Sequence, residues 1–278
     1  MINQRKLVFL KPDSDKFYLE AKSLSCLLQL IYDISWHLYH MFNILKDTSF
    51  IMLHLFLEFS KMKIHYIGES SSVLNTFIAE IRDKKIQKDS LRFRRNIERI
   101  GEILSYELSK SLSYSDVYVE TPLGKKKVQL SDNDLVLCSI LRAGLPLHQG
   151  LLNYFDKAEN AFISAYRHHP KNNHEFEIVV EYFAAPEIKN KTLILADPML
   201  ATGQSLMAVY EAIKKYGTPK ELHIIVVIGS KDGIDFIEKH FPENTHLWIA
   251  AIDDTLNDKG YIVPGLGDAG DLAFGQKL

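Results

Sequence analysis

The sequence predicts an α/β fold, with a mostly parallel central sheet and helices on both of its faces. Short apolar runs that are typical of buried strands alternate along the chain with segments of helical periodicity. This alternation indicates a parallel sheet, and such sheets bind ligands beyond the carboxyl ends of their strands. Strands are expected at 135–140, 161–166, 192–196, 222–228 and 247–252, and helices near 145–155, 204–216 and 232–240.

A longer helix is predicted upstream of these strands. Its apolar residues recur three and four positions apart, as on the buried face of an amphipathic helix: Phe93, Ile97, Ile100, Leu104 and Leu108. The outer side of the same helix carries Arg92, Arg95 and Arg99, which we interpret as a solvated face.

Two further segments predict a hairpin and a turn. Between His168 and Pro186 the sequence is polar and then alternates between apolar and polar residues, which predicts a projecting β-hairpin arm. Gly124 is followed by three lysines, Lys125 to Lys127, and we interpret this run as a charged turn.

Composition bounds the class of protein. With 278 residues, 46% of them hydrophobic, the chain can bury one substantial core. Its net charge of −2 argues against a dedicated nucleic-acid surface, so no nucleic acid is expected as a partner. Cys26 and Cys138 lie far apart in apolar runs, which indicates neither a disulfide framework nor a metal site and favours a reducing, cytoplasmic location.

The most informative segment spans residues 193–206. An apolar strand leads into Asp197, a proline turn and a small-residue loop at 202–205, before helical periodicity resumes. The unpaired N–H groups and the dipole of a helix start bind anions, and small side chains let a phosphate approach closely. The sequence therefore predicts an anion-binding loop, with Asp197 at the strand end to bind hydroxyl groups.

Two common nucleotide-binding motifs do not fit the chain. The loop at 202–205 lacks the lysine of an ATP-binding P-loop, because Gln204 follows Gly203. Gly265 to Gly270 matches the string G-x-G-x-x-G, but only eight residues follow it, too few for a dinucleotide-binding βαβ unit. A nicotinamide cofactor is therefore not expected.

Three ordered motifs resemble those of the type I phosphoribosyltransferases, and of the uracil phosphoribosyltransferase family in particular. Residues 197–203, Asp-Pro-Met-Leu-Ala-Thr-Gly, resemble that family's diphosphoribosyl-binding loop, and Ser139 to Gly144 resembles its pyrophosphate-binding loop. Tyr261 to Asp271 resembles its uracil-binding segment almost letter for letter. The likeness covers about Met62 to Leu278, which is 217 residues, and leaves the first 61 without a counterpart.

The resemblance implies a reaction of pyrimidine salvage, in which uracil and 5-phosphoribosyl 1-diphosphate give UMP and pyrophosphate. Mg2+ is implied as the cofactor, held mainly by the substrate rather than by direct protein ligands. The implied catalytic residues are Asp197, Asp268 and Arg142. The implied contacts with 5-phosphoribosyl 1-diphosphate are Arg142, Arg167, Asp197, Pro198, Met199, Leu200, Ala201, Thr202, Gly203, Gln204, Ser205 and Asp268, and those with uracil are Ile262, Gly267, Asp268 and Ala269.

The chemistry of these residues agrees with that reaction. In an oxocarbenium-like transition state, positive charge grows on the ribose and negative charge on the departing pyrophosphate. Arg142 and Arg167, which each follow a strand-like run, would bind the pyrophosphate, and Asp197 would hold the ribose hydroxyls. The C-terminal glycines would expose main-chain donors and acceptors to the edge of uracil and so reject cytosine.

Two positions depart from the family pattern. Ala196 stands before Asp197 where many relatives in the wider class have a second acidic residue, although uracil-specific members also have one. Gln204 stands where the family commonly has a second glycine, which restricts the backbone of the 5′-phosphate loop.

Two alternatives stay open. One is a regulator of the same fold that senses UMP and binds RNA, but the slightly acidic chain lacks the broad basic face expected of it. The other is a different oxopyrimidine or a purine as the base, against which the glycine–aspartate segment argues. The resemblance also implies a homo-oligomer, a dimer or tetramer, and raises GTP as an activator, although no residue identifies either.

The first 61 residues are interpreted as an N-terminal extension of unknown function, and residues 62–278 as the phosphoribosyltransferase domain. Within 24–57, charges such as Asp33 and Lys46 interrupt every apolar run before the roughly 20 residues of a membrane span, so no membrane partner is expected. Acidic residues before the apolar part argue against a signal peptide. We hypothesise that the functional start is Met62; the rival hypothesis is a helical hairpin that docks on the enzyme or a membrane surface.

Overall fold

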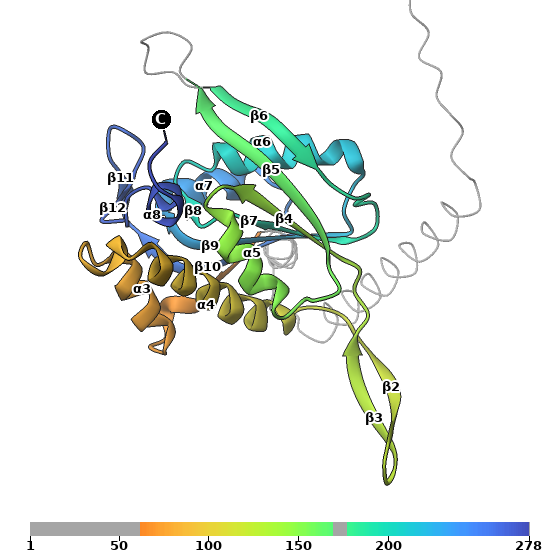
Figure 1. Cartoon of the computed structure of the whole chain (residues 1–278). Coiled ribbons are helices and arrows are strands. Elements are labelled where there is room, and N and C mark those ends of the chain that lie inside the picture. Colours follow the sequence, from red (N-terminus) through yellow and green to blue (C-terminus); the bar gives the residue numbers. More distant parts are fainter. Residues whose placement is uncertain (1–61, 169–176, 278) are drawn as a thin grey trace, which may run out of the picture. The chain divides into compact units, whose positions relative to one another are not determined.

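The computed structural model describes residues 62–168 and 177–277 (Figure 1). The central sheet of this part of the chain has the strand order β1-β10-β9-β7-β4-β5-β6, with the short β8 beside β9. Its strands are β1 Lys63–Tyr66, β4 Leu135–Leu141, β5 Glu159–His168, β6 Glu177–Ala184, β7 Thr192–Ala196, β8 Met199–Leu200, β9 Glu221–Ser230 and β10 Thr245–Asp253. β6 runs antiparallel to β5, whereas the other pairs are parallel. The predicted, mostly parallel sheet and its predicted strands are confirmed.

Helices cover both faces of this sheet (Figure 1). The helices and 3-10 turns are η1 Ile67–Glu69, α3 Leu74–Arg82, η2 Ile86–Lys88, α4 Ser90–Ser109, α5 Gly144–Leu152, α6 Gln204–Ile213, η3 Lys214–Tyr216, α7 Lys231–His240 and α8 Ala269–Phe274. One buried apolar cluster joins the sheet to α3, α4, α5 and α8, and a second joins it to α6 and α7. Alternate residues of a strand serve the two clusters, since Leu137 of β4 lies in the first and Cys138 in the second.

The predicted amphipathic helix is α4. Its five predicted apolar residues are each at most 2% exposed. The carboxylate of Asp89 caps its start by accepting the N–H of Arg92 at 3.1 Å. Arg92 and Arg95 form exposed ion pairs on the outer side with Glu80 and Glu98, as a solvated face predicts. Arg99 differs, because it is half-buried over the ring of Phe77.

Two glycines bring α5 close to α4. A Cβ added to Gly101 would lie 2.9 Å from the carbonyl oxygen of Leu147, and one added to Gly150 would lie 2.2 Å from that of Glu98. Glycine is therefore required at this helix contact. The contact fixes α5 and, with it, the loop that joins β4 to α5.

The arm predicted at 168–186 corresponds to β6, which pairs with β5 at the edge of the central sheet. Its projection stays a prediction, because the tip at 169–176 lies outside the described residues. A second hairpin was not predicted. The prediction of a charged turn at 125–127 is wrong, because these lysines lie on β3 Gly124–Ser131, which pairs with β2 Tyr114–Thr121. Cross-strand pairing explains the error: the ammonium of Lys127 lies 2.7 Å from the carboxylate of Asp116.

Candidate functional site

The predicted site residues gather beyond the carboxyl ends of the parallel strands. Arg142 follows β4 and Asp197 follows β7, while Asp253 is the last residue of β10. A short antiparallel pair, β11 Thr255–Leu256 and β12 Ile262–Val263, then leads into α8. Neighbouring parallel strands end at the same edge of a sheet, so these segments form one candidate site.

Asp197 begins a loop that is tied to the central strand β9. Its N–H donates to the carbonyl of Ile225 at 3.1 Å, and its carboxylate accepts the N–H of Met199 at 3.2 Å. The carbonyl of Pro198 accepts the N–H groups of both Val227 and Ile228. The turn after β7 is therefore held by main-chain bonds to the middle of the sheet.

The second half of this loop packs against the start of α7. The hydroxyl of Ser230 donates to the carbonyl of Ala201 at 2.6 Å and accepts the N–H of Gly233 at 2.9 Å. Gly203 has a φ of +77°, and a Cβ there would lie 2.6 Å from Cδ1 of Phe236. Only glycine fits this position, both in conformation and in space.

The helix start at α6 has the features of an anion site. Gly203 is the N-cap, and no side chain caps the helix there, so its first N–H groups are left for a ligand. Thr202 and Ser205 are partly exposed and Gln204 is exposed. The structure thus places the predicted small-residue loop at the start of a helix.

Arg142 and Asp268 are brought together from distant parts of the sequence. The guanidinium of Arg142 donates to the carboxylate of Asp271 at 3.1 Å and to the carbonyl of Gly275 at 3.2 Å. Asp268 caps α8 by accepting the N–H of Asp271 at 3.0 Å. A Cβ added to Gly270 would lie 3.2 Å from the Asp268 carboxylate and 3.7 Å from the Arg142 guanidinium. Both charged groups therefore flank the same point.

Arg142 also retains unused donor capacity. Its buried Nε has no hydrogen-bond partner within the described residues. A buried unpaired donor on a cation is costly unless a ligand satisfies it, so this atom fits the binding of an anion.

The segment expected to contact the base lies between β12 and α8. Ile262 is 3% exposed and Ala269 is 4% exposed, so their side chains belong to the core. Gly267 has a φ of +94°, and a Cβ there would meet no atom within 4 Å. Main-chain groups beside open space are therefore what this segment offers to a ligand.

Sequence reasoning missed two residues that hold this segment. The guanidinium of Arg82 forms two hydrogen bonds of 2.8 Å with the carboxylate of Asp253, and both side chains also bond to the backbone of Gly265. Asp253 carried a signal, because it follows an apolar strand as Asp197 does. Arg82 carried none, since it lies 171 residues away from its partner in the sequence.

A buried polar pair supports the loop that carries Arg142. The hydroxyl of Ser139 lies 2.7 Å from Nδ1 of His148, and neither residue is more than 4% exposed. Burial lowers the pKa of His148, an effect that a hydrogen bond with Asn160 opposes. The pair links the end of β4 to α5 across residues 141–144.

Arg167, the second predicted diphosphate contact, lies on β5. Its backbone pairs with Ile178, and its side chain lies outside the described part of the structure. The described residues contain no group of three or more histidine, cysteine, aspartate or glutamate side chains arranged to hold a metal ion. None of the described helices has the length and apolar character needed to cross a membrane.

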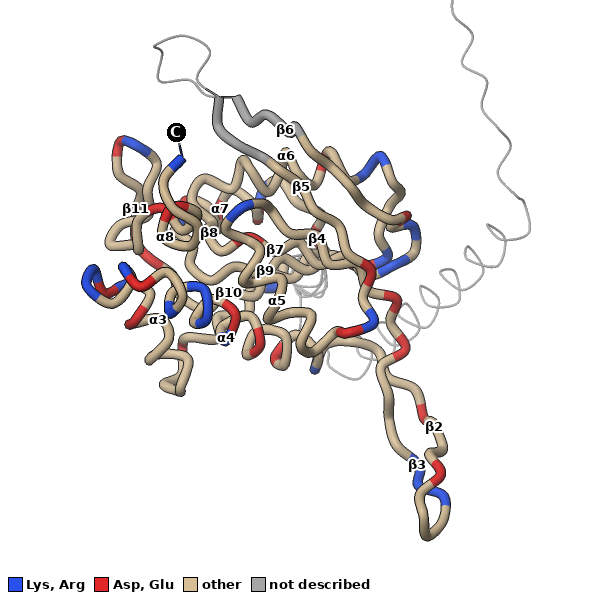
Figure 2. The backbone as a smooth tube through the Cα atoms, in the orientation of Figure 1, with Lys and Arg blue, Asp and Glu red and all other residues tan. Residues whose placement is uncertain are grey.

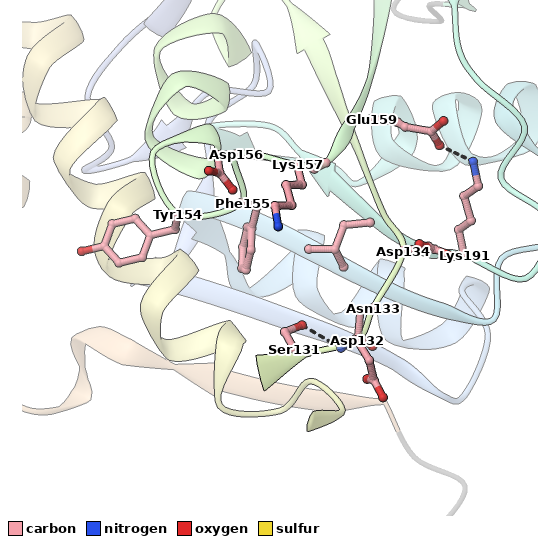
Figure 3. A pocket seen from close by; sticks show the side chains of 12 residues that line it. Ser131, Asp132, Asn133, Asp134, Tyr154, Phe155, Asp156, Lys157, Glu159 and Lys191 are labelled. Carbon is pink, nitrogen blue, oxygen red and sulfur yellow. Dashed lines mark hydrogen bonds and ion pairs between the residues drawn. The ribbon is translucent and has the colours of Figure 1, made fainter. Parts of the chain in front are cut away.

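A cavity among the described residues lies at the other edge of the sheet (Figure 3). It has a volume of about 660 Å³ and is lined by residues at the starts of strands, among them Leu135, Glu159 and Lys191. The side chains of Glu159 and Lys191 form an ion pair at its edge. Parallel strands place their starts at the edge opposite to their ends, so this cavity is not the candidate site.

A family model and curated relatives agree on one family. The family model described as uracil phosphoribosyltransferase matches residues 69–276. Uracil phosphoribosyltransferase of Porphyromonas gingivalis is 52% identical over 217 residues, which is 78% of this chain and 100% of that protein. The enzyme of the same name from Pyrococcus furiosus is 41% identical over 77% of this chain and 90% of that protein. Among solved structures, the AQ2163 protein from Aquifex aeolicus matches with a TM-score of 0.68 and 30% identity, over 76% of this chain and 98% of that one.

Proposed function

Because the chain belongs to the uracil phosphoribosyltransferase family, whose reaction gives UMP and pyrophosphate, we propose that the loops at the carboxyl edge of its sheet perform this transfer. The enzyme takes the phosphoribosyl group of 5-phosphoribosyl 1-diphosphate and transfers it to N1 of uracil. The assignment of the site rests on one observation: the side chains of Arg142 and Asp268 both lie close to Gly270. A basic and an acidic group at one point suit a reaction that separates charge.

The sugar and its 5′-phosphate are assigned to the loop after β7. The first turn of α6, with Thr202, Gly203, Gln204 and Ser205, would bind the 5′-phosphate through N–H groups and the helix dipole. The carboxylate of Asp197 would accept hydrogen bonds from the ribose hydroxyls and stabilise positive charge on the ring.

The departing pyrophosphate is assigned to the loop after β4. Arg142 would place its guanidinium beside the diphosphate, where the unpaired Nε gains a partner. Arg167 of β5 is assigned to the same diphosphate on the basis of its place at a neighbouring strand. Positive charge here favours the bond-breaking step, because negative charge grows on the leaving group.

Uracil is assigned to the segment 262–269. Its edge presents an acceptor, a donor and an acceptor, and main-chain N–H and C=O groups beside Gly267 would pair with them. Cytosine reverses two of these groups and would leave buried groups unpaired, so the main chain itself would select the base.

Mg2+ is the implied cofactor, and the donor set at the site fits it. The carboxylates of Asp197 and Asp268 are oxygen donors, which Mg2+ prefers, and substrate phosphates commonly supply its remaining ligands. When bound, the ion offsets the charge of the leaving pyrophosphate. We assign Asp268 to face the metal–diphosphate complex, with the substrate holding most of the coordination.

The charge distribution does not favour the RNA-binding regulator. Figure 2 shows Lys and Arg interspersed with Asp and Glu along the described elements, including the ion-paired arginines of α4. RNA binding of that kind requires a broad basic face. Catalysis is therefore the function that the described residues support best.

A homo-oligomer and a cytosolic location complete the proposal. On one face of the β2–β3 hairpin, the strand register brings together Val117, Val119, Val128 and Leu130. Three of these are at least 38% exposed, and an isolated two-stranded hairpin is only marginally stable, which supports burial against another copy. Buried Cys138 is a free thiol, in keeping with a reducing compartment.

Pyrophosphate release tests the proposal. The full chain with 5-phosphoribosyl 1-diphosphate and Mg2+ should turn over with uracil, and not with cytosine, orotate or hypoxanthine. Asp268→Asn should reduce kcat by about a hundredfold or more while the circular dichroism spectrum stays unchanged. Unchanged turnover of this variant would remove Asp268 from the mechanism, and saturable UMP binding without turnover would support the regulator.

A further inference from the structure

The side chains of Arg82 and Asp253 form a clamp on one residue of the base segment. Both oxygens of Asp253 accept hydrogen bonds from the Arg82 guanidinium at 2.8 Å, and one of them also accepts the N–H of Gly265 at 2.9 Å. Arg82 in turn donates to the carbonyl of Gly265 at 3.1 Å. The ion pair thus holds the main-chain donor and the main-chain acceptor of the same residue.

The clamped residue lies where the segment bends. Gly265 has a φ of +59°, and a Cβ there would lie 2.0 Å from the carbonyl oxygen of Ile262. The turn leaves no room for a side chain, so its geometry is set by the backbone alone. Ile262 and Gly267, the assigned base contacts, lie on either side of this bend.

A third side chain from the same region reinforces the bend. The amide of Gln87 donates to the carbonyl of Leu266 at 3.3 Å and to those of Ile81 and Arg82 at the end of α3. The end of α3 is thereby tied to two successive residues of the base segment, Gly265 and Leu266. A rigid helix and the end of a central strand together hold an otherwise irregular loop.

The ion pair acts on the loop and not on a ligand. The Asp253 side chain is 7% exposed and its oxygens are engaged by Arg82 and Gly265. A buried carboxylate is tolerated when a cation and hydrogen bonds satisfy it, and fork-shaped Arg–carboxylate pairs fix geometry tightly. Removal of either partner should therefore displace the main-chain groups of the base segment.

We propose that Arg82 and Asp253 are positioning residues that determine the specificity for uracil. They hold the bend at Gly265 so that the main-chain donors and acceptors on both sides of it match the edge of the base. This inference rests on the proposed assignment of 262–269 as the base site. It predicts an effect on the base that is separate from any effect on the sugar diphosphate.

Steady-state kinetics with each substrate varied provide the test. Asp253→Asn keeps the shape and removes the charge, and Arg82→Lys keeps the charge and removes the fork. Each should raise KM for uracil about ten- to a hundredfold, the cost of a lost charged hydrogen bond, with KM for 5-phosphoribosyl 1-diphosphate changed less than about twofold. The preference for uracil should weaken, so that turnover with cytosine becomes measurable, and Arg82→Lys should be milder than Arg82→Gln.

Arg92→Lys is the matched control. Arg92 forms a similar forked pair with Glu80 between α3 and α4, at 2.6 and 2.9 Å, without touching the base segment. This variant should leave both KM values unchanged. Should Asp253→Asn not fold, Gln87→Met leaves the Arg82–Asp253 pair in place. It removes the bond to Leu266 together with those to Ile81 and Arg82, and should raise KM for uracil severalfold.

Two results would overturn the proposal. The first is an equal rise of both KM values in the Arg82 and Asp253 variants; the second is an unchanged uracil KM and base preference. Gly267→Ala tests the assignment of the base site independently of Arg82 and Asp253, because it places a methyl group in the open space at the assigned base contact. If Gly267→Ala raises the uracil KM and Arg82→Lys does not, the positioning role of Arg82 and Asp253 is refuted and the base-site assignment stands. If neither variant raises it, both are refuted.

Discussion

Ser139 and His148 are joined by a buried hydrogen bond of 2.7 Å that spans the loop carrying Arg142. Burial lowers the pKa of His148, so the imidazole is neutral at physiological pH. Its ring also lies 4.7 Å from that of Phe162 on the neighbouring strand. The loop that carries Arg142 therefore rests on a buried polar contact and not on an ion pair.

Ser139→Ala should destabilise the protein by about 1–3 kcal/mol, because Nδ1 of His148 loses its buried partner. The free energy of unfolding in urea measures this loss. KM for 5-phosphoribosyl 1-diphosphate should rise more than KM for uracil, since the affected loop carries Arg142. Ser139→Thr keeps the hydroxyl and serves as the control, and an unaltered urea midpoint in Ser139→Ala would contradict the assigned role.

Gly203→Ala should lower the stability of the protein. The new Cβ would meet Phe236 at 2.6 Å and would also occupy a positive φ. The dihedral cost alone is about 1–2 kcal/mol, and the clash adds to it. Differential scanning calorimetry should show a lower Tm than for Gly275→Ala, which has a φ of +86° and no atom within 4 Å of the added Cβ. Equal Tm values would mean that Phe236 of α7 moves away from the added methyl group without loss of stability.

Stability should fall as the pH is lowered from about 6.5 toward 4. Burial and the nearby His223, His65 and Lys63 lower the pKa of His246 to about 4, against an effect of Glu221 that raises it. Between 4 and 6.5 the unfolded chain binds a proton that the folded chain does not, so acid favours unfolding there. His246→Leu should flatten this part of the pH profile of Tm. A profile with the same slope as that of the parent would assign the effect to other groups.

A chain that begins at Met62 should keep kcat and both KM values within about twofold, because every assigned contact lies within residues 142–269, inside the range that the family model matches. Sedimentation with vesicles should be compared for the two lengths. Loss of activity or of vesicle binding on truncation would support the rival docking hairpin. Intact-mass analysis of the native protein tests the start site directly, since a terminus at Met1 or Ile2 refutes it.

The repeating parts of the fold could be predicted because their patterns are local. The spacing of Phe93, Ile97 and Ile100 reports one face of α4, and the run before Asp197 reports a buried strand. The β2–β3 hairpin was missed because its three lysines suggested a turn, and their ion-pair partners Asp116 and Glu120 lie on the neighbouring strand. The residues next to these lysines in the sequence do not indicate which residues lie across from them on the paired strand.

The candidate site likewise has a part that local sequence predicts and a part that it does not. Asp197 and the helix start at Gly203 belong to one continuous strand–loop–helix unit, and the structure brings them together as the sequence predicted. The clamp joins Arg82 to Asp253 across 171 residues, and no periodicity connects them. A pairing of this kind depends on the tertiary arrangement of α3 and β10.

The bonds between the Asp197–Leu200 turn and β9 bear on how each half of the site moves. Because those main-chain bonds belong to the central sheet, the amides of Val227 and Ile228 should exchange with deuterium only through opening of the core. The base segment is held by side chains instead: Ile262, Leu266 and Ala269 are buried, and Arg82, Asp253 and Gln87 bond to its backbone. Loss of one of these side chains should therefore speed deuterium exchange in the base segment and leave the amides of Val227 and Ile228 unaffected.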